Sequence, residues 1–171
     1  MQALQSACSV IAAFTLGVVP AVAQDAGKVE VTPYAAVGSA GASPVGVAIT
    51  LPVNRTFSVE TGVAYRRGEG RIHALRTDAS LLWSLPRVGL FTPYVAAGLG
   101  LSQYGAPVFS SSGPPVGTLA RVALTVNAGG GVKAPMNGKL DLRTDVRWFK
   151  ALGGSEQFRV AQGISFHAGR R

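Results

Sequence analysis

The stretch Leu140-Asp141-Leu142-Arg143-Thr144-Asp145-Val146-Arg147-Trp148-Phe149 decides the fold of this chain. Apart from Thr144, its even positions carry apolar side chains, and its odd positions up to 147 carry charges. Successive side chains of a β-strand point to opposite faces of a sheet, whereas a helix repeats about every 3.6 residues. The period of two therefore predicts a strand with one apolar and one charged face.

The same alternation continues in both directions from this stretch. Turn residues divide the chain from residue 28 onward into about eight such segments. They are Lys28–Gly38, Pro44–Leu51, Phe57–Arg66, Ile72–Leu85, Leu90–Tyr104, Thr118–Lys133, Lys139–Phe149 and Gln157–Ala168. Most reach the roughly nine to eleven residues that a tilted membrane strand requires. We therefore predict an all-β chain of eight antiparallel strands.

The connections between these segments alternate in length. Those at Pro52–Thr56, Pro86–Gly89 and Ala134–Gly138 are tight, and the last contains the Asn-Gly hairpin signal. Those after odd-numbered segments are longer, above all Gly105–Gly117 with its Ser and Pro residues. Short turns at one end and long loops at the other are typical of an up-and-down outer-membrane barrel.

The composition narrows the class of protein. Hydrophobic residues make up 47% of the 171 residues, which is too high a fraction for a disordered chain. Charged residues make up 14%, below the roughly 25% that is typical of soluble globular domains. After the N-terminus no apolar run approaches the roughly 20 residues of a membrane helix. Although the net charge is +8, the basic residues are dispersed, and we expect no nucleic-acid binding.

The N-terminus has the features of an export signal. An apolar stretch, Val10–Val19, ends in Ala21-Val22-Ala23, the small-x-small pattern that a signal peptidase cleaves. We expect a signal peptide at 1–23 and a barrel domain at 24–171. The first nine residues contain no Lys or Arg, which is atypical. Because the one cysteine is Cys8, the mature chain would have no disulfide.

Period-two alternation alone does not say which face is inside, since a soluble sandwich or lipocalin-like barrel shows it too. The face opposite the apolar one collects Glu30, Glu60, Asp78, Asp141, Asp145, Arg76, Arg121, Arg143, Arg147 and Arg159. On a soluble surface such a balance is unremarkable. Inside an eight-stranded barrel, which is just wide enough for side chains to fill, it would form a paired charge network.

Three further features favour lipid on the outside. The apolar face is nearly continuous around all eight segments, whereas a sandwich leaves some edge strands polar on both sides. Aromatic residues gather toward the strand ends, as membrane-interface girdles do: Phe57, Trp83, Phe91 and Phe166 at the turn side, and Tyr65, Trp148, Phe149 and Phe158 at the loop side. Finally, Gly98, Gly100, Gly129 and Gly131 fall on the inward face, where they would leave room for arginines.

Three motifs resemble a known family. Thr92-Pro93-Tyr94-Val95-Ala96-Ala97-Gly98-Leu99-Gly100, then Asn127-Ala128-Gly129-Gly130-Gly131-Val132-Lys133, then Leu140 through Phe149 resemble the outer membrane protein β-barrel domain family, the OmpA- and OmpX-like small barrels. The similarity covers nearly the whole chain after the signal. It implies an eight-stranded transmembrane barrel inserted by the outer-membrane assembly machinery. Such barrels usually end in an aromatic residue, but here Phe166 is followed by five more residues.

Catalysis and metal binding find little support. Lipid A deacylases on this scaffold use His and Ser, which draws attention to His73, Ser165 and His167. However, His167 would lie at the turn end, away from the outer leaflet, and His73 would point with the apolar face. Two distant histidines give no metal-ligand spacing. Gly129–Gly131 lacks the Gly-Lys-Ser/Thr ending of a phosphate loop. We expect no enzyme, no cofactor and no metal.

Arg66, Arg67 and Arg71 cluster in the second long loop. They are either solvated loop charges or contacts to lipopolysaccharide phosphates, which arginine binds well. The expected protein is a non-enzymatic monomer of the bacterial outer membrane, with a charge-plugged lumen and an envelope-structural or surface-interaction role. A narrow porin-like channel for ions or small solutes is one alternative. A soluble secreted β-sandwich or lipocalin-like binding module is another.

Overall fold

A computed structural model describes residues 28–39, 43–67, 73–109, 115–154 and 156–168. The expected signal peptide at 1–23 and the loop residue Arg71 lie outside this part of the chain. Within the described residues, no helix is long and apolar enough to cross a membrane.

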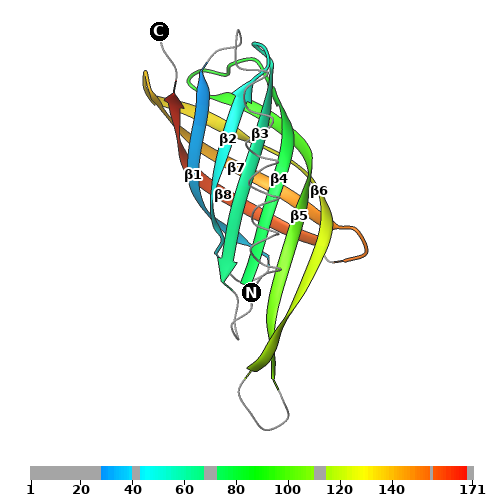
Figure 1. Cartoon of the computed structure of the whole chain (residues 1–171). Coiled ribbons are helices and arrows are strands. Elements are labelled where there is room, and N and C mark those ends of the chain that lie inside the picture. The colour runs from blue at the N-terminus through cyan, green and yellow to red at the C-terminus, as the bar shows by residue number, and fades with distance from the viewer. Residues whose placement is uncertain (1–27, 40–42, 68–72, 110–114, 155, 169–171) are drawn as a thin grey trace.

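Eight strands form one closed antiparallel barrel in sequence order, with β8 returning to pair with β1 (Figure 1). The strands are β1 Val29–Gly38, β2 Val45–Pro52, β3 Phe57–Arg67, β4 His73–Ser84, β5 Thr92–Phe109, β6 Pro115–Asn137, β7 Leu140–Ala151 and β8 Glu156–Ala168. All eight predicted strands are thus confirmed. The β-sandwich alternative is wrong, because the strands close into a single sheet without an edge.

The two ends of the barrel differ. The β2–β3, β4–β5 and β6–β7 connections share one end, which we call the turn end, and the other connections share the loop end (Figure 1). At the turn end, the side-chain oxygen of Asn137 accepts a hydrogen bond from the Lys139 amide at 2.9 Å. Asn54 likewise accepts bonds from the amides of Thr56 and Phe57, at 2.8 and 2.7 Å. Two of the three predicted tight turns are therefore held by asparagine side chains, and the β4–β5 turn is held by backbone hydrogen bonds between Val88 and Phe91.

The predicted long loop at Gly105–Gly117 is wrong for most of its length. Pairing between β5 and β6 continues to Phe109 and Pro115, so both strands extend beyond the barrel at the loop end (Figure 1). Pairing of β4 with β5 stops at Gly105, and pairing of β6 with β7 stops at Thr125. In this two-stranded ribbon each strand pairs on one side only, and its other side has no neighbouring strand. Proline, which lacks a backbone N–H donor, is tolerated in strands of this kind.

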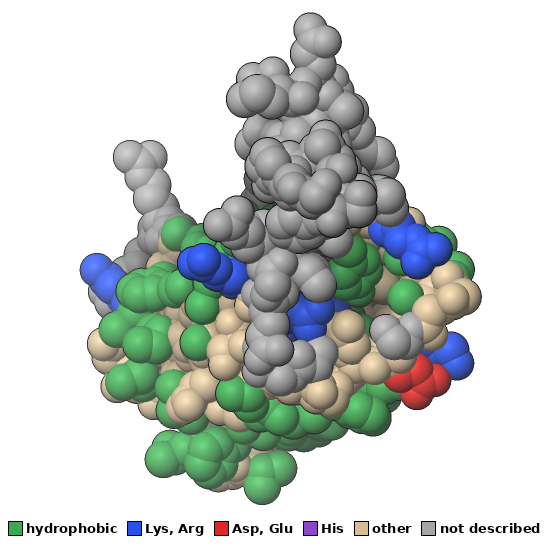
Figure 2. All heavy atoms as spheres, turned by 90° about the horizontal axis from the view of Figure 1, so that it is seen from below, with side chains coloured by type: hydrophobic (Ala, Val, Ile, Leu, Met, Phe, Trp, Pro, Cys, Tyr) green, Lys and Arg blue, Asp and Glu red, His purple; other side chains and the backbone are tan. Residues whose placement is uncertain are grey.

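The barrel is inverted relative to a soluble protein. Apolar side chains cover its outside, with Leu99 58% and Val146 49% exposed, and Figure 2 shows them over the sides that are in view. Asp145 and Arg147, the neighbours of Val146 on β7, are 4% and 1% exposed. The buried set is mainly polar, whereas a soluble core is apolar. The predicted orientation, apolar face outward, is therefore confirmed.

The aromatic residues follow the prediction with one exception. Phe57 and Trp83 stack on the outer face with ring centroids 6.3 Å apart, and Tyr65 and Phe158 are exposed near the loop end. Phe149, however, is 1% exposed and lies inside the barrel, not in the outer girdle. Two consecutive aromatic residues on a strand must point to opposite faces, and Phe149 shares the inward face with Arg147.

Candidate functional site in the polar interior

Glu60 lies at the centre of the barrel and binds two arginines. It comes from β3, and both arginines come from β7 on the far side of the interior. Its Oε1 accepts a hydrogen bond from Arg147 at 2.5 Å, and its Oε2 accepts one from Arg143. The hydroxyl of Thr50 also donates to Oε2, at 3.0 Å. Glu60 is therefore satisfied on both oxygens although it is 2% exposed.

Asp145 forms a second centre on β7 itself. Residues 143, 145 and 147 share one face of this strand, so the two arginines flank the carboxylate. Asp145 Oδ2 accepts bonds from Arg147 Nε at 3.0 Å and from Arg143 at 3.3 Å. The hydroxyl of Tyr94 donates to the same oxygen at 3.2 Å and accepts from Arg143 Nε at 2.7 Å. Strand β7 thus supplies one carboxylate and two guanidinium groups of the network.

Asp78 and Arg159 complete a central layer of balanced charge. Arg147 lies 3.8 Å from Asp78, and Arg159 lies 3.5 Å from Asp145. Arg159 also donates to the hydroxyl of Tyr34 at 3.0 Å. Three carboxylates, those of residues 60, 78 and 145, then face three guanidinium groups, those of residues 143, 147 and 159. Such pairing is what allows ions to stay buried.

Inward-facing glycines make room for this layer, as predicted. A Cβ on Gly129 would lie 3.0 Å from Arg147 Cγ, and one on Gly131 would lie 2.7 Å from the Tyr94 hydroxyl. Gly98 and Gly100 would contact Ser80 and Asp78 in the same way. The glycine-rich strands β5 and β6 thus allow large polar side chains from β4 and β7 to fill the lumen.

Smaller polar contacts fill the turn end. Lys133 pairs with Glu30 at 2.5 Å, and His167 with Asp141 at 2.9 Å. Ser165, with no exposed surface, shares a hydrogen bond with Thr32 at 2.8 Å. The Lys133 pair had a detectable sequence signal, because Lys133 continues the inward face of Gly129 and Gly131 on β6.

The ten residues expected in the lumen network fall into four groups. Six form the central layer: Glu60, Asp78, Asp145, Arg143, Arg147 and Arg159. Glu30 and Asp141 belong to the separate pairs at the turn end. Arg76 lies toward the loop end and stacks on the Phe149 ring at 4.0 Å. Arg121 is placed differently from expectation: it shares the inward face of β6 with Thr125, but its side chain is exposed.

Two of the three loop arginines lie on opposite faces of β3. Arg66 shares the alternation of the buried Gly62 and Ala64, and its side chain lines a cavity inside the barrel. Arg67 is exposed on the outer face. Strand alternation therefore separates these two arginines, and Arg67 is the one of the two described residues that is directed toward the surroundings of the barrel.

The geometry does not bring the suspected Ser and His together as a catalytic pair. Ser165 hydrogen-bonds Thr32, and His167 bonds Asp141 instead. A nucleophile and its base need a mutual hydrogen bond, which is not found between these two side chains. Among the described residues, no group of three or more His, Cys, Asp or Glu could hold a metal ion.

Comparison with known proteins agrees with this architecture. No protein-family model matches the chain, and no curated protein is significantly similar in sequence. The N-terminal β-barrel domain of Pseudomonas aeruginosa OprF is similar in structure, with TM-score 0.66 and 15% identity over 84% of this chain and 98% of that domain. Neisserial surface protein A gives a TM-score of 0.61 and 12% sequence identity, covering 82% of this chain and 95% of that protein.

Two further solved structures extend the range of functions on this fold. The attachment invasion locus protein Ail of Yersinia pestis gives TM-score 0.55 and 12% identity, covering 84% of this chain and 99% of Ail. The outer membrane enzyme PagL gives a TM-score of 0.52 and 11% sequence identity, covering 80% of this chain and 98% of PagL. These identities are low, so the likeness is one of fold. It confirms that the chain has the architecture of the small eight-stranded outer-membrane barrels.

Proposed function

We propose that this chain, whose fold is that of the small eight-stranded outer-membrane barrels, is a non-enzymatic protein of a bacterial outer membrane whose lumen is closed by charged side chains. The inverted burial carries the proposal: apolar residues such as Leu99 and Val146 are exposed, while Arg147 is 1% exposed. An aqueous surround would leave that apolar exterior unfavourably hydrated, whereas hydrocarbon would not. Export by the signal peptide at 1–23 belongs to the same proposal.

The central layer supports the closed lumen. Glu60 and Arg147 come from strands on opposite sides of the barrel and meet at 2.5 Å. Arg143 and Asp145 fill the space beside them. A barrel of eight strands has an interior only wide enough for such side chains. We infer that the protein acts through its exterior and its ends, as a structural or surface-interaction component of the envelope.

A narrow channel is the second candidate. Asp78 Oδ1 and Arg159 Nε are buried without hydrogen-bond partners, and both residues line a small polar cavity beside the central layer. Water in that cavity would satisfy both atoms. A chain of such waters would be required for ions to pass, and the ion pairs interrupt it.

Two measurements test these proposals. A folded membrane barrel should migrate faster on a detergent gel before boiling than after it, and it should partition with membranes. Planar-bilayer recording of the refolded chain should show no steady single-channel conductance. Fractionation with the soluble periplasm would contradict the membrane proposal. A steady conductance would support the channel instead.

Lipopolysaccharide contact belongs to the same proposal, now resting on Arg67, which is exposed near the loop end beside Tyr65 on the outer face of β3. Because arginine forms bidentate bonds with phosphate oxygens, Arg67→Gln should weaken association with lipopolysaccharide vesicles. Unchanged association would remove this part of the proposal. The outer-membrane assembly machinery is the proposed partner during insertion. Because the eight strands of one copy close the barrel, the proposed oligomeric state is a monomer.

A further inference from the structure

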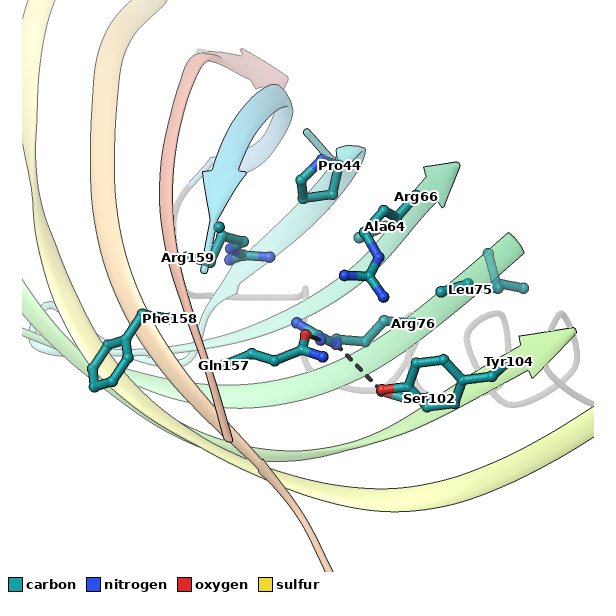
Figure 3. A pocket seen from close by; sticks show the side chains of 12 residues that line it. Pro44, Ala64, Arg66, Leu75, Arg76, Ser102, Tyr104, Gln157, Phe158 and Arg159 are labelled. Atoms are coloured by element: carbon teal, nitrogen blue, oxygen red, sulfur yellow. Dashed lines mark hydrogen bonds between the residues drawn. The ribbon is translucent and has the colours of Figure 1, made fainter. Parts of the chain in front are cut away.

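A pocket toward the loop end of the barrel gathers three arginines from three strands. Arg66 of β3, Arg76 of β4 and Arg159 of β8 extend their guanidinium groups into it (Figure 3). Ser102, Gln157 and the apolar Leu75 belong to the same lining. No Asp or Glu is among the described residues that line this pocket. The pocket is therefore strongly cationic.

The counterions available to these arginines are few. Arg76 donates to two neutral groups, the Gln157 side-chain oxygen at 2.7 Å and the Ser102 hydroxyl at 3.3 Å. Arg159 reaches Asp145 only at 3.5 Å, and that carboxylate already serves two other arginines. Within the described part of the chain, Arg66 makes no ion pair. Each arginine thus has incomplete charge compensation.

A charge count shows that this deficit belongs to the loop end. The central layer contains three carboxylates and three guanidinium groups, one of them Arg159, so its formal charge is zero. Arg66 and Arg76 then add two positive charges that this layer does not balance. In addition, Arg159 is 6% exposed, and its Nε has no hydrogen-bond partner. Arg66 and Arg76 are half-buried, and cations held in this way beside a buried guanidinium group, without enough carboxylates, favour a bound anion.

We propose that the pocket binds one oxyanion group of the phosphate or sulfate class, held between Arg66, Arg76 and Arg159. Guanidinium groups bind such oxygens in bidentate geometry, and three of them from different strands surround a tetrahedral group. The hydroxyl of Tyr104 in the lining offers a further donor. The group could belong to a free solute or to a glycolipid headgroup, since both present the same oxygens.

The first arm of the test uses inorganic phosphate and sulfate as probes. The full chain is refolded in a maltoside detergent, because phosphocholine detergents would supply the same chemistry, and is titrated calorimetrically at constant ionic strength. We expect saturable binding at one site. Arg66→Gln and Arg76→Gln should each weaken it about tenfold or more, as expected for a lost charged hydrogen bond. Arg76→Lys, which keeps the charge, should lose less.

Arg55→Gln is the matched control, because Arg55 is an exposed arginine in the β2–β3 turn at the opposite end of the barrel. The affinity of this variant for phosphate should equal that of the unaltered chain. Heat-modifiable migration verifies the folding of every variant. Absence of saturable binding for both anions, or an equal loss in Arg55→Gln, would overturn the proposal.

A second arm distinguishes the two sources of the group. The barrel is reconstituted in vesicles with and without lipopolysaccharide, and phosphate affinity is measured in each. A lower apparent affinity with lipopolysaccharide assigns the site to a headgroup, and an unchanged affinity assigns it to a free solute. The inference requires the closed barrel but not a closed lumen, so its outcome is independent of the conductance measurement.

Discussion

At the scale of single residues, the interior depends most on Glu60. Its carboxylate is shared by Arg143 and Arg147, and all three side chains are at most 5% exposed. Glu60→Gln keeps the shape but leaves two guanidinium groups short of a counterion. Breaking a buried pair in this way typically costs about 3–5 kcal/mol. We expect a loss of that order in the free energy of unfolding, measured by urea titration of the refolded barrel.

The control for Glu60 is Glu156. Like Glu60, it forms an ion pair with a basic residue of β7. It pairs with Lys150 at 3.0 Å, but its side chain is 51% exposed. Exposed ion pairs contribute little to stability because water solvates both charges. Glu156→Gln should therefore leave the unfolding curve almost unchanged. Equal losses in the two variants would show that burial of the Glu60 pairs is not what stabilises the barrel.

Gly131 shows how closely the backbone of β6 approaches the polar layer. A Cβ there would overlap the Thr144 carbonyl oxygen on β7 and lie 2.7 Å from the Tyr94 hydroxyl. Gly131→Ala should force the two strands apart and the tyrosine to move, at about 1–3 kcal/mol of unfolding free energy or more, a usual cost of overpacking. Urea unfolding measures it. Gly138→Ala at the β6–β7 turn, where a Cβ would meet nothing within 4 Å, should cost much less.

At the scale of strands, alternation could be predicted from the sequence, but position along the barrel axis could not. The inward face of β7 follows from its odd positions, and the structure confirms this for Arg143, Asp145 and Arg147. Arg121 obeys the same alternation on β6 yet is exposed, because β6 continues beyond the point where β7 pairs with it. Strand length beyond the barrel depends on pairing between neighbours, which a single strand's pattern does not contain.

The sequence also does not predict which charged side chains pair across the lumen. Glu60 meets Arg147 because of the register of every strand between them, and each register is set by turns and packing together. Tyr94 and Tyr34 were missed although alternation predicts their side, because Tyr94 shares the inward face of Gly98 and Gly100, and Tyr34 shares that of Glu30. Alternation does not contain the partner, and in the structure the two hydroxyls bind Arg143 and Arg159.

The outward face of the strands provides a direct test of the lipid environment. Leu99, in the part of β5 that pairs with both β4 and β6, is 58% exposed. Leu99→Arg should lower the free energy of unfolding from a lipid bilayer by about 2–4 kcal/mol, since a cation would enter hydrocarbon. Val88→Arg in the β4–β5 turn, where Val88 is 68% exposed, should cost about 0–1 kcal/mol. Equal, small effects would favour water around the barrel.

At the scale of the whole molecule, polar chemistry changes along the barrel axis. The turn end holds two separate pairs, Lys133 with Glu30 and His167 with Asp141. The centre holds the balanced layer, and the loop end holds the surplus arginines. Figure 2, which views the molecule from the loop end, shows more Lys and Arg than Asp and Glu there. The proposed anion pocket shares Arg159 with the central layer, but Arg66 and Arg76 lie outside the ion pairs that close the lumen and can be altered without them.

This separation leads to a prediction about permeation. Arg147 and Glu60 meet from opposite sides of the barrel, and Arg147 is among the largest fully buried side chains. Arg147→Ser combined with Glu60→Gln removes one positive and one negative charge, so the net charge stays constant while side-chain volume is lost at the centre. We expect water to fill that space and a measurable single-channel conductance to appear in planar bilayers. The doubly altered exposed pair, Lys150→Ser with Glu156→Gln, removes the same charges at the loop end and should leave the bilayer current at its original level. A conductance that rises equally in both variants would place the barrier to ions elsewhere than in the central layer.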